Sequence, residues 1–102
     1  MIMVDNNYTG QAIGIFELDS FMACLVALDA AAKAADVKVQ GVERNRLKAG
    51  ACVKLRGDVS SVRAAMDAAL AAAAPYGKVT ASTVISAPDA GTEYGIAATI
   101  GR

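Results

Sequence analysis

Histidine and tryptophan are absent from the 102 residues, and only two cysteines are present. Without histidine, the chain lacks the side chain that most often acts as acid, base or metal ligand near neutral pH. Cys24 and Cys52 are far apart and form no CxxC pair, so in a reducing compartment we expect both to be small core residues. A metal site or a histidine-based catalytic triad is therefore not expected.

An excess of charge of one sign and a long apolar run are also missing. Ten Lys and Arg residues balance ten Asp and Glu residues, so no strong field attracts nucleic acid or an anionic membrane. Asp29, Lys33 and Asp36 interrupt the helical apolar stretches before they reach the about 20 residues that span a bilayer. Residues 1–10 lack the order of a signal peptide. We therefore expect no nucleic-acid or membrane partner, and a cytoplasmic location.

Aromatic residues are scarce, at 5% of the chain, although hydrophobic residues make up 55%. Much of the difference is alanine, which lets elements pack closely while it fills little volume. The core is therefore expected to be thin and flat. In a single domain of this size, the apolar excess indicates surface that is buried against other copies of the chain.

The apolar pattern predicts strands and helices in a clear order. Short apolar or alternating runs predict four strands, at residues 12–18, 37–44, 51–56 and 78–86. Helical spacing predicts one helix over residues 21–35 after Ser20 and another between Asp58 and Pro75. The order is strand, helix, strand, strand, helix, strand. It predicts an α/β (α+β) domain of ferredoxin-like type, with a four-stranded antiparallel sheet and both helices on one face.

Each predicted helix has an expected apolar face. For the first helix, the face is formed by Phe21, Leu25, Leu28 and Ala32. For the second helix, the face is formed by Val59, Val62, Met66, Ala69, Leu70 and Ala73. A short, loosely held helix is expected near the C-terminus, over residues 92–100.

The two middle strands are predicted to form a hairpin with a long basic tip. Alternation predicts Val39 on one side of the first strand and Val42 on the other. In the second strand, Cys52, Lys54 and Arg56 share one side, opposite to Ala51, Val53 and Leu55. Positive charge gathers near the tip at Arg44, Arg46 and Lys48. This charge has two possible explanations. One is a solvated basic turn, and the other is a ring of charge around an axis where several copies meet.

Motifs for other functions are absent or have a structural explanation. Residues 56–58 form an RGD tripeptide, which we interpret as a strand end, a turn and a helix cap. No glycine frame for a dinucleotide or a nucleoside triphosphate occurs, and the two middle strands carry no aromatic residue that could stack on RNA. Nothing pairs Glu17, Asp19 or Glu43 in a pocket, so we expect these carboxylates to be solvated.

Residues 12–88 resemble the shell domain of bacterial microcompartments, the BMC domain. The resemblance is carried by AIGIFEL at 12–18, ALDAAAKAADV at 27–37, GVER at 41–44, KLRGDVSSVRAAMDAALAAA at 54–73 and GKVTASTVI at 77–85. It implies a structural protein that forms flat cyclic homohexamers, which tile into a shell facet and pass small polar metabolites through a central pore. The implied partners are other shell proteins (hexamers, trimers and pentamers) and encapsulated enzymes.

The resemblance also assigns roles to single residues. Lys33 and Asp36 correspond to positions at the hexamer edge, where lysines of neighbouring hexamers lie antiparallel. Ala87 stands before Pro88 where the family often has arginine, so one hydrogen-bonding group is missing from the seam between hexamers. The assembly residues implied by the resemblance are therefore Lys33, Asp36 and Ala87.

The pore residues follow from the hairpin tip. Many family members carry Gly-Ser-Gly there, whereas this hairpin is one residue longer. Counting back from Arg56 places Lys48 at the position of the pore serine, flanked by Leu47 and Ala49. If Lys48 or Arg46 faces the axis, six copies form a cationic constriction.

These inferences define one domain with a structural role. Residues 1–10 are expected to be a short N-terminal segment, residues 11–88 the shell domain, and residues 89–102 a partly helical tail. No catalytic residue, metal ligand or cofactor is expected, so the protein is not expected to be an enzyme. The alternative hypothesis is a ferredoxin-like regulatory module that binds a small molecule in a pocket.

Overall fold

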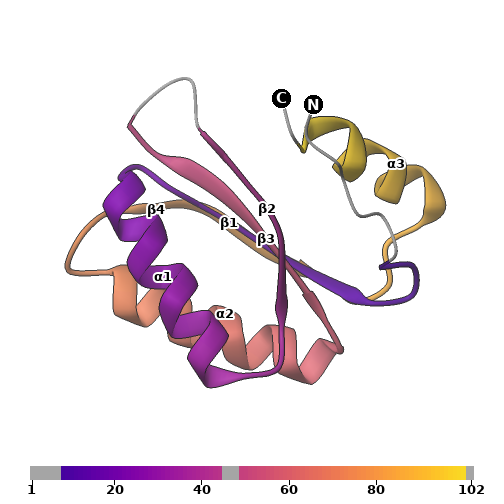
Figure 1. Cartoon of the computed structure of the whole chain (residues 1–102), viewed down its shortest axis with the longest axis horizontal. Helices are drawn as coiled ribbons and strands as arrows, with labels where there is room; N and C mark the ends of the chain where they lie inside the picture. Colours follow the sequence, from indigo (N-terminus) through magenta and orange to yellow (C-terminus); the bar gives the residue numbers. More distant parts are fainter. Residues whose placement is uncertain (1–7, 45–48, 101–102) are drawn as a thin grey trace.

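The computed structural model describes residues 8–44 and 49–100, and within these ranges four strands form one antiparallel sheet. The strands are β1 (Ala12–Leu18), β2 (Lys38–Arg44), β3 (Ala51–Gly57) and β4 (Val79–Ile85). Their order across the sheet is β2-β3-β1-β4, so β2 and β4 are the edge strands (Figure 1). The predicted antiparallel sheet is confirmed.

Two long helices cover one face of this sheet, as predicted. They are α1 (Phe21–Ala34) and α2 (Val59–Ala73). A shorter helix, α3 (Ala90–Thr99), lies on the other side of the sheet (Figure 1). We call the face opposite to α1 and α2 the open face.

The predicted caps hold the two long helices in place. The Ser20 hydroxyl accepts a hydrogen bond from the Ala23 amide at 3.3 Å, and the Asp58 carboxylate accepts one from the Ser61 amide at 2.9 Å. The bond from the Ser61 amide, followed by the bond from the Ser61 hydroxyl, lowers the pKa of Asp58. The structural interpretation of the RGD tripeptide therefore agrees with the position of Asp58 as an N-cap.

The predicted apolar face of α1 was wrong, because alanines form the buried face. The buried residues of α1 are Ala23, Cys24, Ala27 and Ala31. Leu25 is 49% exposed and Ala32 is also exposed, while Phe21 and Leu28 are half-buried. Small side chains let α1 approach α2, and the larger side chains are left on the outer side of the helix.

The face of α2 matches the prediction better. Val62, Met66, Ala69 and Ala73 are buried as expected, together with Ala65, which the prediction missed. Val59 is exposed and Leu70 is only half-buried. The small residues at every fourth position therefore face the small residues of α1.

A glycine in β1 lets α2 lie close to the sheet. A Cβ atom on Gly14 would lie 2.8 Å from Val62 Cγ1 and 2.9 Å from Met66 Cγ. Real Cβ atoms do not approach other atoms so closely, so any side chain here would push α2 away from β1. Together with the alanines, Gly14 therefore lets α2 pack close to the sheet.

A bulge in β2 overturns the predicted alternation of this strand. Val39 pairs with Leu55, but Gly41 pairs with Lys54 and Val42 with Val53, so the register shifts at Gln40. One extra residue moves every following side chain to the other face. Val39 and Val42 therefore lie on the same face of the sheet, not on opposite faces.

The alternation predicted for β3 is confirmed, but both of its faces are buried. Arg56, on the open face, is 0% exposed. Its guanidinium donates hydrogen bonds to the Glu93 carboxylate in α3, to the Gln40 side chain and to the carbonyl oxygens of Tyr8 and Gln11, at up to 3.2 Å. One side chain thus ties α3, β2 and the segment before β1 to the centre of the sheet, so the tail is not loosely held.

We expect Arg56→Met to lower the free energy of unfolding by about 3 kcal/mol, because it leaves the partly buried Glu93 carboxylate without its cation. Urea unfolding followed by circular dichroism at a fixed chain concentration measures this loss. Arg63→Met is the matched control, because Arg63 is exposed on α2 and its replacement should leave the curve unchanged. Equal stability of both variants would contradict the proposed role of Arg56.

Candidate functional site

The strand pairing defines two opposite ends of the sheet. One end, which we call the hairpin end, is marked by the paired row Arg44, Ala51, Leu18 and Val79. The other end, which we call the lysine end, is marked by the row Lys38, Arg56, Ile13 and Ile85. The strands span seven residues each, so the two ends are separated by roughly 20 Å.

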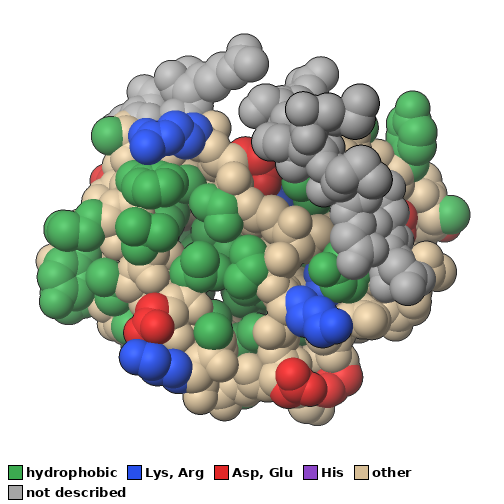
Figure 2. Space-filling view, in the orientation of Figure 1, with side chains coloured by type: hydrophobic (Ala, Val, Ile, Leu, Met, Phe, Trp, Pro, Cys, Tyr) green, Lys and Arg blue, Asp and Glu red, His purple; other side chains and the backbone are tan. Residues whose placement is uncertain are grey.

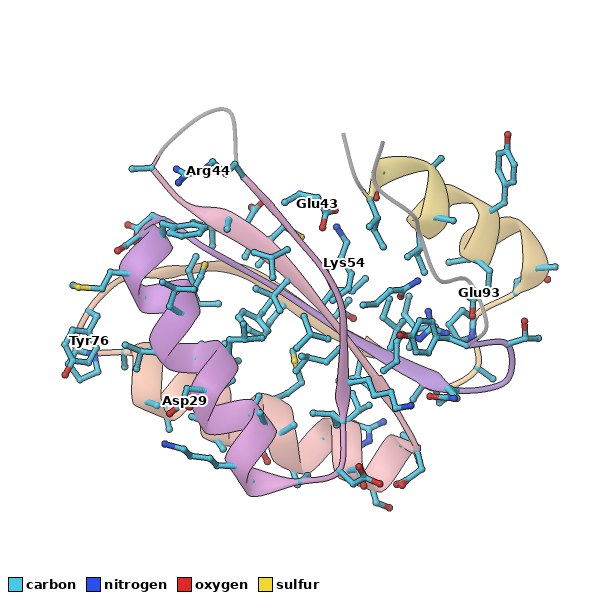
Figure 3. All side chains as sticks on the ribbon, viewed as in Figure 1. Asp29, Glu43, Arg44, Lys54, Tyr76 and Glu93 are labelled. Carbon is cyan, nitrogen blue, oxygen red and sulfur yellow. The ribbon has the colours of Figure 1, made fainter. Side chains whose placement is uncertain are left out.

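Lys33 lies at the lysine end, in the last turn of α1. Its ammonium group is 2.7 Å from the Asp29 carboxylate one turn earlier, and the two side chains are 76% and 64% exposed (Figure 3). An exposed pair of this kind contributes little stability. Lys33 can therefore exchange Asp29 for a partner on another molecule at small cost.

The other two predicted edge residues lie at the same end but not side by side. Asp36 is exposed in the link between α1 and β2, so it shares one corner of the domain with Lys33. Ala87 is exposed after β4, at the opposite edge of the sheet. Three strand spacings separate β2 from β4, or about 14 Å. One molecule therefore presents Lys33 with Asp36 at one corner and Ala87 at another.

Three of the four predicted pore residues, Arg46, Leu47 and Lys48, lie outside the described residues. Ala49 is described and exposed, and its carbonyl oxygen accepts a hydrogen bond of 2.7 Å from the Phe21 amide. This bond ties the returning side of the hairpin to the start of α1.

The residue after Ala49 fixes the base of the hairpin against β1. A Cβ atom on Gly50 would lie 1.9 Å from the carbonyl oxygen of Leu18, so only glycine fits there. Nearby, the Asp19 amide donates to the Lys78 carbonyl oxygen and the Lys78 amide donates to the Asp19 carboxylate at 2.8 Å. The hairpin therefore starts from a closely tied platform.

Arg44 adds a positive charge at this platform. Its guanidinium lies over the Phe21 ring, 4.3 Å from the ring centroid, and the side chain is exposed. Figure 3 shows Arg44 at the end of β2, where the hairpin leaves the sheet. The stacking limits the positions of the charge while leaving it open to solvent.

The sequence predicted exposed apolar surface but not its place, which is on α1 and β2. We call it the lateral face, and its most exposed members are Met22, Leu25, Val39 and Val42, at 59%, 49%, 41% and 38% exposure. Figure 2 shows hydrophobic side chains gathered over α1 and towards the adjoining sheet edge. The signal that could have revealed it is the alanine spacing at 23, 27 and 31, which marks the packed side and so places the larger side chains outside.

The open face carries charged and polar groups that the sequence analysis left unpaired. Glu43, predicted to be solvated, is half-buried and accepts a hydrogen bond from the Lys54 ammonium group, whose side chain is 9% exposed. The two side chains point towards one another in Figure 3. The other Glu43 oxygen is buried and has no partner among the described residues.

The two cysteines differ in their surroundings. Cys24 is buried, as predicted, and its thiol donates to the Ala51 carbonyl oxygen at 3.4 Å. Cys52 is only half-buried and lies on the open face. Burial raises the pKa of both thiols. In the described ranges, no three His, Cys, Asp or Glu residues are grouped so as to hold a metal ion, and no helix is long and apolar enough to cross a bilayer.

Comparison with known proteins adds to this geometry. The BMC domain family matches residues 12–88. The bacterial microcompartment shell protein EutM of Escherichia coli strain K12 is 39% identical over 79 residues, which cover 76% of this chain and 79% of that protein. The bacterial microcompartment shell protein PduA of Salmonella typhimurium is 39% identical over 84 residues, which cover 81% of this chain and 87% of that protein.

A solved structure agrees with the sequence relatives. The crystal structure of a microcompartment protein from Desulfitobacterium hafniense is similar with a TM-score of 0.70 and 28% sequence identity. The match covers 87% of this chain and 47% of the solved chain, so the chain spans about half the length of that protein. With a family match across most of its length and relatives above 30% identity, the chain belongs to the BMC domain family.

Proposed function

We propose that this protein is a structural shell protein of a bacterial microcompartment in the cytoplasm and that it has no catalytic activity. In this proposal the chain forms cyclic homohexamers, which tile with other shell proteins into a facet around encapsulated enzymes. A central pore passes small polar metabolites. The observation that carries the proposal is the exposed lateral face on a domain of the BMC family.

The lateral face supports self-assembly because a lone domain exposes these apolar side chains to water, which costs free energy. Met22 and Leu25 are exposed on α1 and Val39 and Val42 on β2, and Figure 2 shows hydrophobic side chains gathered over α1 and towards the adjoining sheet edge, so much exposed apolar area lies on this side of the domain. Apolar surface gathered in this way is typical of contacts between proteins. A second copy of the same chain would remove it from water in every subunit of a ring.

The two ends of the sheet support different roles within such a ring. The hairpin end carries a tied platform and the positive charge of Arg44, which suits the axis where copies converge. The lysine end carries the weakly held Lys33 and the exposed Asp36, which suits the outer rim. A lysine there can cover apolar surface with its stem and donate to carbonyl oxygens across a seam.

We expect Leu25→Asp to prevent hexamer formation, because it places a charge in the lateral face that the ring would have to desolvate. Native mass spectrometry measures the distribution of oligomers. Tyr94→Asp is the matched control, since Tyr94 is 78% exposed on α3 and lies outside the lateral face. Hexamers of the Leu25→Asp variant in wild-type yield would exclude the lateral face as the contact between subunits.

We expect Lys33→Ala to leave hexamers intact while it weakens the formation of sheets or tubes, because Lys33 lies at the proposed rim. Electron microscopy detects the sheets and tubes, and native mass spectrometry of the same samples detects the hexamers. Lys78→Ala is the control, since Lys78 is exposed at the hairpin end. Unchanged sheets would remove Lys33 from the seam between hexamers.

We expect Lys48→Glu to reverse the charge preference of the pore, because six copies of the substitution turn a cationic constriction into an anionic one. Conductance across hexamers inserted in a planar bilayer gives the ratio of anion to cation passage. If the ratio stays the same, Arg46 or another residue lines the constriction.

A further inference from the structure

A hollow of about 210 Å³ opens on the open face of the sheet, beside the edge strand β4. It is lined by Ile15, Glu17, Cys52, Ala81, Ser82 and Thr83, from β1, β3 and β4. The strand pairing places Ile15 beside Thr83 and Glu17 beside Ala81. The lining is mostly apolar, with a carboxylate, a thiol and hydroxyl groups at its edge, which is the usual composition of a small-molecule site.

The carboxylate of this hollow is held in position. One Glu17 oxygen accepts a hydrogen bond of 3.0 Å from the Thr80 hydroxyl on β4. The same hydroxyl lies 3.2 Å from the Glu17 carbonyl oxygen, which limits its rotation. No described residue donates a hydrogen bond to the other carboxylate oxygen, so an acceptor remains for a ligand.

The charges around the hollow favour a cation. Glu17 and Glu43 flank Cys52 in one row across β1, β3 and β2. Burial is the largest cause of the raised pKa of the Cys52 thiol; the charge of Lys54 acts against it, and the charges of Glu43 and Glu17 add to it. Lys54 is the positive group nearby, and its ammonium is engaged by Glu43. Two carboxylates and one ammonium leave one negative charge, and the neutral thiol does not change this sum.

We propose that the hollow binds a small primary ammonium compound with a short apolar tail. The ammonium group would donate to the free oxygen of Glu17 and to the Thr83 hydroxyl, and the tail would lie on Ile15 and Ala81. This site is separate from the proposed lateral face and pore, because it lies on the open face of a single subunit. Its test therefore does not depend on assembly into shells.

Saturation-transfer NMR of the purified chain tests the proposal with n-butylammonium, butyrate and 1-butanol as probes. The method detects weak ligands, and it can be applied to the chain whether it is monomeric or assembled. We expect saturable transfer to n-butylammonium and at least about tenfold weaker binding of butyrate, because butyrate loses the charged hydrogen bond and is repelled by Glu17. No saturable transfer to n-butylammonium, or equal binding of butyrate, would overturn the proposal.

Two variants and one control assign the binding to this hollow. Glu17→Gln keeps the acceptor for Thr80 but removes the charge, and should weaken n-butylammonium binding about tenfold or more. Ala81→Leu should abolish binding by filling the hollow. Asp67→Asn removes the same charge from the exposed side of α2 and should change nothing. Equal affinity of Glu17→Gln and Asp67→Asn would refute the role of Glu17.

The alkylation rate of Cys52 tests independently whether the ammonium compound binds in the hollow. N-ethylmaleimide should alkylate Cys52 faster than the buried Cys24, and mass spectrometry distinguishes the two sites. Saturating n-butylammonium should slow alkylation of Cys52 several-fold, with no effect from butyrate at the same ionic strength. Alkylation of Cys52 that is insensitive to n-butylammonium would place the binding elsewhere and overturn the proposal.

Discussion

The close approach of α1 and α2 to each other and to the sheet is the constraint on which the rest of the molecule depends. It requires alanines such as Ala27 and Ala69 between the helices, and Gly14 where α2 crosses β1. A contact between helices that is built from such small side chains has no room there for larger ones. Met22 and Leu25 therefore lie outside it, so the packing that brings the two helices together leaves these apolar side chains exposed.

The open face is organised by a different principle, the burial of paired charge. Arg56 joins Glu93 of α3 to the backbone before β1, while Lys54 and Glu43 form a second pair beside it. The bonds of Arg56 hold α3 and the segment before β1 against the sheet, and the pair of Lys54 and Glu43 joins β3 to β2. The helix-covered face thus has an apolar core with small side chains where the helices meet, and the open face carries ionic and hydrogen-bonded contacts.

Features that depend on local sequence could be predicted, whereas contacts between distant residues could not. The elements and the antiparallel sheet followed from periodicity and caps, because those signals act over a few residues. The buried face of α1 was missed because hydrophobicity ranks Leu25 above Ala27, although close packing favours the smaller side chain. The bulge at Gln40 moves the apolar positions from the odd number of Val39 to the even number of Val42, a change of phase that strict alternation does not allow for. The bond between Arg56 and Glu93 joins residues 37 positions apart, so nothing local reveals it.

For the candidate site too, some features could be predicted from the sequence and others could not. Lys33 and Asp36 do share one corner, and Ala87 lies at the same end of the sheet but across it. Their proximity to a neighbouring molecule depends on an arrangement of several copies, which no single-chain pattern encodes. The place of the lateral face was not predicted because the ranking by hydrophobicity placed Leu25 in the core, as in the wrong assignment of the buried face of α1.

Gly50 has a consequence for how this kind of domain can diversify. Its backbone lies against the Leu18 carbonyl oxygen so closely that no side chain can enter, and the neighbouring Ala49 carbonyl is bonded to Phe21. The returning strand is therefore anchored before any residue of the tip is reached. Length and charge of the tip can therefore change during evolution while the scaffold stays fixed, so the chemistry of the tip and the architecture of the domain are inherited as separable traits.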